Sequence, residues 1–273
     1  MIVKVSTAAI GVLCVSAGSA FAQGAEGLLG YDGGGNDLYS IEAAPVASNF
    51  IGNDLASGIP AEIEYGGGLV YAADTGVNTN LHAIDPSTGL VQSTLTMNFP
   101  GSGNVITSLE FVGNRLYGGL TTEGGGETFL STIDLNTGMV SLVGGPTGVG
   151  SPLGGLAYDG SRLYAVSAGG SGGMLYTIDL GTGAASAPIT VSLAGANIGL
   201  TALEFGTDGR LYALPNSSSN FAGHLLVIDP NTGIATDLGD TGVFGLNALT
   251  SVPAPGTLAL LGALAIGRRR RGS

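Results

Sequence analysis

Three glutamates recur at one position of a repeated sequence unit, and they are the first candidates for chemistry. Glu64, Glu110 and Glu204 each stand in the middle of an apolar-x-aromatic triplet: Ile63-Glu64-Tyr65, Leu109-Glu110-Phe111 and Leu203-Glu204-Phe205. If the triplets lie around one axis, the carboxylates approach one another, and like charges that close raise some pKa values or recruit a cation such as calcium. Alternatively, each glutamate accepts hydrogen bonds from backbone amides of a neighbouring unit, which is the interpretation we favour.

Two further units are expected to lack the acid, with Ala157 and Asn247 at the equivalent position. The predicted carboxylate cluster therefore has three members, and the sequence assigns no catalytic residue and no metal ligand with it. Glutamates could still serve as acid and base in a hydrolase or lyase acting on extracellular carbohydrate. Glycosidase carboxylates lie roughly 5 to 10 Å apart and open onto a cleft, so geometry distinguishes the two alternatives.

Other polar residues repeat with the unit and are expected to be structural. Asp-x-x-Thr-Gly turns begin at Asp85, Asp134, Asp179 and Asp229, where the carboxylate accepts bonds from turn amides. Pairing with nearby carboxylates is favoured over a substrate clamp for Arg115, Arg162 and Arg210. His82 and His224 belong to different units and are not expected to converge on a metal. The chain has no Trp to stack on a quinone cofactor and no nucleotide-binding lysine motif, so no cofactor is predicted.

The elements that position these residues follow from the repeat, whose turn aspartates are 49, 45 and 50 residues apart. After each triplet come a Gly/Asn/Asp turn and a strand carrying Leu-Tyr or its equivalent. A longer polar loop, a strand ending in Ile-Asp and a fourth strand after the Asp-x-x-Thr-Gly turn complete the unit. Four short alternating strands in roughly 45 residues are the size of one propeller blade.

The start of the mature chain lacks an innermost strand, and Phe244 to Leu249 has no partners of its own. The sequence therefore predicts an all-β fold: a five-bladed β-propeller of four-stranded antiparallel blades, closed by a C-terminal strand joining the first blade. The propeller domain is expected over residues 23–252, with blades at about 28–52 plus 244–250, 61–97, 107–144, 154–192 and 201–239. The units resemble extracellular propeller repeats of the YVTN and quinoprotein-like kind, and this resemblance implies fold more than activity.

The amino-acid composition limits the classes of molecule that the protein is expected to bind. Residues 23–252 contain three Arg, no Lys and all 20 carboxylates, so their formal charge is 3 − 20 = −17. Such a body repels nucleic acid and anionic membrane surfaces. The single cysteine, Cys14, lies in the predicted leader, which leaves no disulfide for the mature chain. Loops rich in Asn, Ser, Thr and Gly follow the second strands and would suit a glycan or surface polymer, although loops that bind nothing are equally compatible.

Both ends of the chain predict export. Residues 1–22 have the form of a signal peptide, with Lys4, an apolar stretch and an Ala20-Phe21-Ala22 cleavage site. A lipoprotein attached through Cys14 is the alternative, and Leu13 disfavours it. At the other end, Pro253 and Pro255 precede ten apolar residues and Arg268, Arg269, Arg270 and Arg271. As a helix, that apolar run would be about 15 Å long, half of what a membrane span needs.

This tail, residues 253–273, resembles the PEP-CTERM sorting signal of exported bacterial proteins, with Ala254 in place of the middle Glu. The resemblance implies recognition by an exosortase-type membrane protease, and release at the cell surface or into the extracellular matrix. A plain C-terminal anchor is the alternative. In either case, contact with the membrane is expected only through the tail. The leading functional hypothesis is a secreted, non-catalytic binding or scaffold protein.

Overall fold

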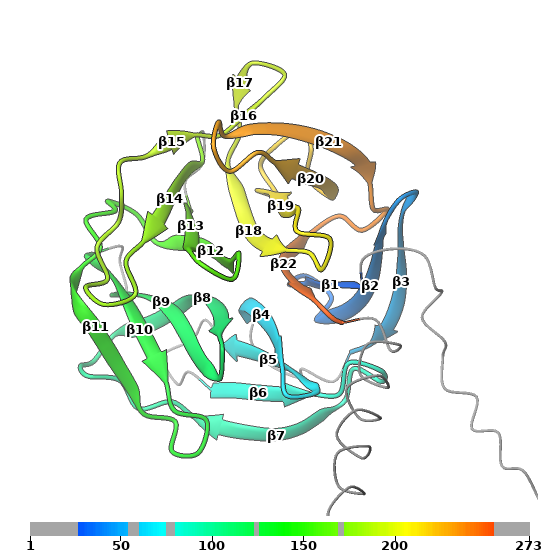
Figure 1. Ribbon diagram of the computed structural model, residues 1–273. Coiled ribbons are helices and arrows are strands. Elements are labelled where there is room, and N and C mark those ends of the chain that lie inside the picture. Colours follow the sequence, from blue (N-terminus) through cyan, green and yellow to red (C-terminus); the bar gives the residue numbers. More distant parts are fainter. Residues whose placement is uncertain (1–26, 54–59, 75–79, 123–125, 169–171, 254–273) are drawn as a thin grey trace, which may run out of the picture.

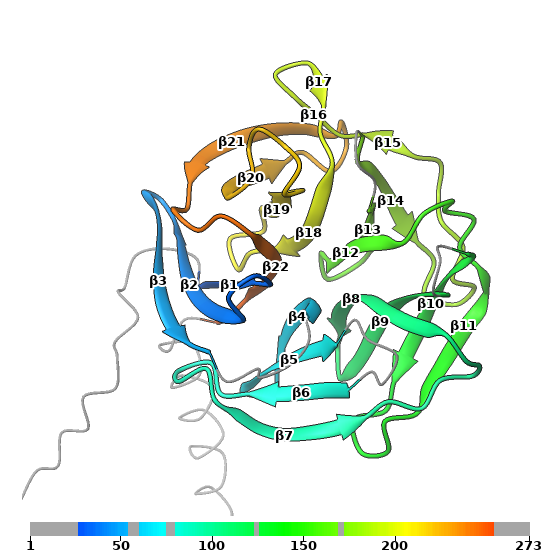
Figure 2. The same ribbon diagram turned by 180° about the vertical axis from the view of Figure 1, so that it is seen from behind.

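The fold is a ring of five small β-sheets around a central axis, as the computed structural model shows in two opposite views (Figures 1 and 2). The structure describes residues 27–53, 60–74, 80–122, 126–168 and 172–253. Neighbouring sheets contact one another through their innermost strands in the cyclic order β4, β8, β12, β18, β22. The prediction of a five-bladed propeller is confirmed.

The blades follow one another along the chain. Blade 1 comprises β1 (Leu28–Asp32), β2 (Asp37–Ala43), β3 (Val46–Gly52) and β22 (Leu246–Ser251). Blade 2 comprises β4 (Pro60–Gly66), β5 (Leu69–Asp74), β6 (Asn80–Ile84) and β7 (Val91–Thr96). Blade 3 comprises β8 (Asn104–Val112), β9 (Arg115–Thr122), β10 (Thr128–Ile133) and β11 (Val140–Pro146). Blade 4 comprises β12 (Leu153–Tyr158), β13 (Leu163–Ser167), β14 (Met174–Ile178) and β15 (Ile189–Thr190). Blade 5 comprises β18 (Leu200–Phe205), β19 (Leu211–Pro215), β20 (His224–Ile228) and β21 (Ile234–Asp240).

The ring is closed by strands from both ends of the propeller. β22 pairs antiparallel with β1, with Leu28 opposite Ser251 and Gly30 opposite Leu249, so the sheet order of blade 1 is β22-β1-β2-β3. The last strand of the propeller thus lies beside its first (Figure 1). Since the closing strand completes a sheet, it covers an edge that would otherwise present unpaired backbone groups.

One blade departs from the predicted four strands. The chain between blades 4 and 5 forms a small hairpin, β16 (Ser192–Leu193) and β17 (Ala196–Asn197), and β16 pairs in parallel with β21. The sheet of blade 5 therefore has six strands, and β15 of blade 4 is reduced to two residues. The segment that was expected to lengthen the outer strand of blade 4 therefore pairs with the outer strand of blade 5 instead.

The core is divided among the blade interfaces. Five clusters of buried apolar side chains each combine residues from two adjacent blades, as Leu81 of blade 2 does with Leu109 of blade 3. Aromatic rings pack in the same interfaces. The ring centroids of Tyr71 and Phe111 lie 5.6 Å apart in an edge-on arrangement, and those of Tyr164 and Phe205 lie 5.5 Å apart. The Leu-Tyr strands and the aromatic ends of the triplets recur because each blade buries its faces against the next.

The outer rim is held by the Asp-x-x-Thr-Gly turns. Each ends in a glycine of positive φ, at +71° for Gly89 and Gly138, +73° for Gly183 and +72° for Gly233. A Cβ at any of them would overlap backbone of the preceding blade; for Gly138 the obstacle is the carbonyl oxygen of Thr96. The turns of one blade thus press directly against the chain of its neighbour, which only glycine permits.

The predicted leader and most of the sorting tail lie outside the described residues, including Ala20, Ala22, Pro255 and the four arginines. Pro253 is the last residue described and follows β22 by two positions. Within the described ranges, no helix is long and apolar enough to cross a membrane.

Candidate functional site

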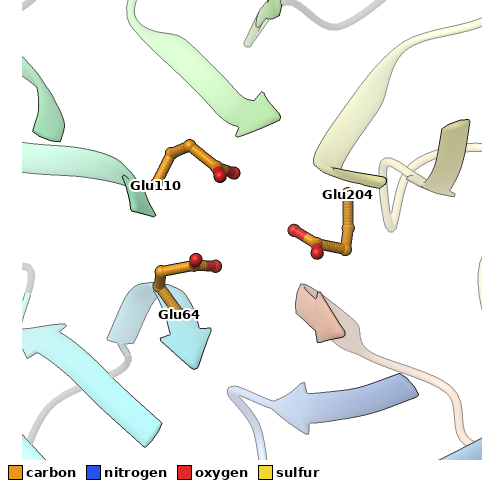
Figure 3. A group of neighbouring side chains, drawn as sticks. All are labelled: Glu64, Glu110 and Glu204. Atoms are coloured by element: carbon orange, nitrogen blue, oxygen red, sulfur yellow. The ribbon is translucent and has the colours of Figure 1, made fainter. Parts of the chain in front are cut away.

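The innermost strands bring the three predicted glutamates together. Glu64 on β4, Glu110 on β8 and Glu204 on β18 each offer a carboxylate oxygen, and these oxygens lie within 4.8 Å of one another. Figure 3 shows the three carboxylates turned toward each other across the axis. The side chains are only 5%, 6% and 6% exposed, so the cluster is nearly sealed from solvent.

Each glutamate also accepts a backbone hydrogen bond from the next blade. The Phe111 N–H donates to Glu64 Oε1 at 3.2 Å, and the Ser251 N–H donates to Glu204 Oε1 at 3.1 Å. The backbone N–H of Tyr158 donates to Glu110 in the same way. In each case the donor is the residue directly after the position that matches the glutamate in the next blade. The same three glutamates therefore fit both interpretations of the sequence. The carboxylates form a cluster and also link the blades.

Thr250, rather than Asn247, holds the equivalent position in blade 1, and that detail of the sequence alignment was wrong. Thr250 lies opposite Leu29, as Glu204 lies opposite Tyr212, whereas Asn247 falls three residues earlier on β22. The Tyr65 N–H donates to Thr250 Oγ1 at 2.9 Å, and the Thr250 hydroxyl donates to Glu64 Oε2 at 3.1 Å. The hydroxyl therefore replaces a carboxylate as acceptor for the next blade.

A fourth carboxylate, Glu62, was not among the predicted residues. It is 1% exposed, and its Oε1 accepts the Leu249 N–H at 2.9 Å. Alternation along a strand places residues two apart on the same side, so the spacing of Glu62 and Glu64 was the available signal. The apolar-x-aromatic triplet does not include position 62, and for that reason the repeat alignment passed over it.

Burial and mutual repulsion disfavour charge at this centre. Burial raises the pKa of Glu64 to about 8. Burial also raises the pKa of Glu110 and Glu204 well above the usual range, with the charge of Glu64 adding to it in both cases. For Glu62 burial again raises the pKa, the Leu249 N–H opposes that rise, and Glu204 and Glu64 reinforce it. Two unit charges about 4.8 Å apart repel by roughly 3.5 kcal/mol at an effective dielectric constant of about 20.

None of the described arginine or lysine residues is buried beside these carboxyl groups. Within the described part of the chain, the Lys and Arg residues are Arg115, Arg162 and Arg210, and all three are exposed. Arg162 lies 3.6 Å from Asp159 and over the ring of Tyr164, and Arg210 lies 3.7 Å from Asp208 and over Tyr212. These arginines belong to the hairpin turns of their own blades.

The two histidines lie in separate blades and pair locally. His82 Nε2 lies 3.0 Å from Asp74 Oδ1, and His224 Nδ1 lies 3.0 Å from Asp237 Oδ1. The turn aspartates likewise bond their own turns: Asp134 Oδ1 accepts the N–H groups of Asn136 and Thr137. Such bonds hold the pKa of the turn aspartates below its usual range.

Two depressions are lined in part by the loop between β19 and β20. One, of about 270 Å³, is lined in part by Asn197, Ser218 and Asn220. The other, of about 260 Å³, is lined in part by Asn216, Ser217 and Asn247 and by the hairpin turn between β1 and β2. Hydroxyl and amide groups dominate the polar part of both linings.

No protein-family model matches this chain, and no curated protein matches it. Many solved structures do. A glutaminyl cyclase from Myxococcus xanthus is 19% identical, with 75% of each chain covered and a TM-score of 0.47. A luciferin-regenerating enzyme is 11% identical (83% of this chain, 80% of the other, TM-score 0.48). A chain of a nidogen/laminin complex is 13% identical (84% and 86%, TM-score 0.48). These structures include enzymes, and similarity at this level carries no function to the present chain.

Proposed function

We propose that this protein is an exported, non-catalytic β-propeller that binds or scaffolds a glycan or surface polymer at a bacterial cell surface or in the extracellular matrix. The sealing of the central glutamates is the observation that carries this proposal. An acid and base for glycoside hydrolysis must reach the scissile bond of a polymer. Side chains that are about 95% buried and hydrogen-bonded to backbone amides are poorly placed for that role.

The ligand surface in this proposal is the pair of depressions beside the β19–β20 loop. Their linings combine exposed Asn197, Ser217 and Asn220 with the ring of Phe221. Sugars are recognised by such amide and hydroxyl groups together with an apolar surface, and ligands of scaffold folds are generally bound by loops. The acidic body favours a neutral or cationic polymer over an anionic one.

A glycan array and sedimentation with insoluble polysaccharides test the binding. We expect retention of the secreted protein on at least one neutral polymer, and loss of retention in the Asn197→Ala/Asn220→Ala double variant. Asn231→Ala, in the turn between β20 and β21, is the matched control and should bind normally. Release of soluble sugar by the wild-type protein, abolished by Glu110→Gln, would instead favour the hydrolase or lyase alternative.

Export through the leader and sorting through the tail are part of the same proposal. Cleavage after Ala22, and an exosortase-type cut near residues 253–257, would release the propeller without its arginine cluster. Pro253 follows the closing strand by two residues, so removal of the tail would cost the propeller none of its described strands. Intact-mass spectrometry of protein from the native cell surface is the measurement. A mass that retains Arg268 to Arg271 would contradict processing and favour a plain anchor.

A further inference from the structure

The centre of the propeller gathers four acidic side chains without a protein counter-ion. Glu64, Glu110 and Glu204 face each other across the axis (Figure 3), and Glu62 lies two residues before Glu64 on β4. The exposed arginines of the described chain are all engaged elsewhere or at the surface. Among the described residues, the centre of the ring therefore holds several carboxyl groups and no arginine or lysine to balance them.

A second observation concerns the oxygens that the backbone does not use. Among the described residues, Glu62 Oε2 and Glu110 Oε2 are buried and have no hydrogen-bond partner, although a backbone amide bonds to the carboxylate of each residue. Buried polar atoms of native proteins are almost always satisfied, so each exception points to a water or ion. Glu110 belongs to the cluster itself, so its unpartnered oxygen indicates a ligand there.

We propose that the central cluster binds one hard divalent cation, Ca²⁺, through Glu64, Glu110 and Glu204. All the available donors are oxygens, which are the ligands of Ca²⁺ and Mg²⁺ rather than of softer metals. Two oxygens bound to one Ca²⁺ at about 2.4 Å can be separated by at most twice that length, and the oxygens of the cluster lie within 4.8 Å of each other.

The choice of Ca²⁺ over Mg²⁺ follows from the irregular set of ligands that the ring offers. Each ligand comes from a different blade, and Ala157 leaves the fifth position of the ring without a donor. Such a site is irregular and would be completed by water. Ca²⁺ tolerates six to eight ligands in variable geometry, whereas Mg²⁺ requires a near-ideal octahedron. Since blades 2, 3 and 5 would share the ion, it would hold the ring together, and this role is independent of the polymer proposed above.

Calorimetric titration of the chelator-treated full chain with CaCl₂ tests the site directly. We expect one Ca²⁺ per molecule, weaker binding of Mg²⁺, and a melting temperature several degrees higher in Ca²⁺ than in chelator. Absence of binding heat together with identical melts in Ca²⁺, Mg²⁺ and chelator would overturn the proposal. The glutamates would then be neutralised by protons alone.

Variants locate the ion. Glu110→Gln retains the side-chain shape and removes one charge, so it should fold in chelator and lose both the binding heat and the Ca²⁺-dependent rise in melting temperature. Glu127→Gln, an exposed change of the same charge in the same blade, should respond like the wild-type protein. If Glu110→Gln does not fold, Glu204→Gln serves in its place, with a Ca²⁺ affinity expected to fall at least tenfold. Unchanged stoichiometry and affinity in the folded variant would place the ion elsewhere and overturn the assignment.

Discussion

The hydroxyl of Thr250 has the hydrogen-bonding role in blade 1 that a glutamate carboxylate has in three other blades. Thr250 accepts a backbone N–H from the next blade and donates to Glu64, and its side chain is fully buried. Four of the five blades thus offer a side-chain acceptor to the neighbouring amide, and blade 4, with Ala157 at this position, is the exception. An ionisable group is not needed for this hydrogen bond, and the inner strands carry ionisable side chains at Glu62, Glu64, Glu110 and Glu204.

Thr250→Val tests the value of this hydroxyl at nearly constant shape. The change leaves the Tyr65 N–H without its acceptor, and it removes the donor to Glu64 Oε2. A buried polar group that loses its partner costs roughly 1 to 3 kcal/mol, so we expect a loss of that size in the free energy of unfolding, measured with urea. Thr236→Val, exposed on β21, is the control and should change stability little. Equal stability of the two variants would show that the hydroxyl does not link the blades.

The raised pKa values predict an unusual pH dependence in the absence of divalent cations. The folded state holds the Glu64 proton more tightly than the unfolded chain does, with a pKa of about 8 against an ordinary 4.5. Its contribution to stability is therefore complete below about pH 4.5 and is lost as the pH rises through 8. The turn aspartates, whose pKa values are lowered, contribute in the opposite direction and lose their effect only in stronger acid.

We expect the melting temperature in chelator to fall steadily from pH 5 to pH 8, with a smaller slope in Glu64→Gln. Differential scanning calorimetry at constant ionic strength measures it. A wild-type melting temperature that rises or stays level over this range would contradict the assignment of raised pKa values to the cluster.

At the residue scale, the sequence predicted the repeated glutamates but not the complete cluster. Glu64, Glu110 and Glu204 share a motif, and a motif repeated around an axis must converge. Glu62 occurs in one blade, so repetition gave no signal for it. Asn247 was wrongly assigned to the glutamate position because Leu246-Asn247-Ala248-Leu249-Thr250 was aligned by its first residues. Alignment with Leu200-Thr201-Ala202-Leu203-Glu204 puts Thr250 at the glutamate position.

At the scale of the elements, the Asp-x-x-Thr-Gly turn combines two constraints in one glycine. Gly138 has a φ of +71°, and a Cβ there would overlap Thr96 of the preceding blade. Gly113, in the hairpin between β8 and β9, has a similar φ of +65° and open space around it. Substituting Gly113 and Gly138 in turn therefore distinguishes the energetic cost of a strained backbone from the cost of disturbing the close packing between blades.

Gly113→Ala should lower the free energy of unfolding by about 1 to 2 kcal/mol, the usual penalty for a left-handed alanine. Gly138→Ala adds a steric overlap with backbone, so its loss should be clearly larger. Chemical denaturation of both variants and the wild-type protein measures the difference. Equal losses would mean that the outer turns do not pack against the neighbouring blade as tightly as described.

The order of strands within a blade could be predicted because alternation and turn residues are local. The small hairpin β16–β17 could not, since Ser192 pairs with Ile234 in the next blade. Two residues of strand carry too little pattern to identify, and the choice between blade 4 and blade 5 is made by packing at a distance. Outer strands are where local signals are weakest, because one side of them faces solvent.

At the scale of the whole molecule, one strand decides whether the propeller is closed. β22 pairs with β1 and contributes Leu246, Ala248 and Leu249 to the buried clusters on both sides of blade 1. Deletion of residues 244–251 should remove this strand and expose those interfaces. The expected loss of several kcal/mol is comparable to the whole stability of a typical domain.

Circular dichroism and thermal melting of the truncated protein measure this loss. Removal of residues 254–273 alone is the matched control and should leave the melting temperature unchanged. A protein without residues 244–251 that melts at the full-length temperature would contradict the structural role of the closing strand.

The pairing of β22 with β1 also has a kinetic consequence. Its partners are more than two hundred residues apart in sequence, so this sheet is completed only after the rest of the chain is available. Until then, the free edge of β1 can accept the same strand from a second molecule, which is the geometry of a domain-swapped dimer. Within one chain, the strand is present at an effective concentration of roughly millimolar. Dilute refolding should therefore yield monomers, whereas refolding at high protein concentration should exchange closing strands between molecules.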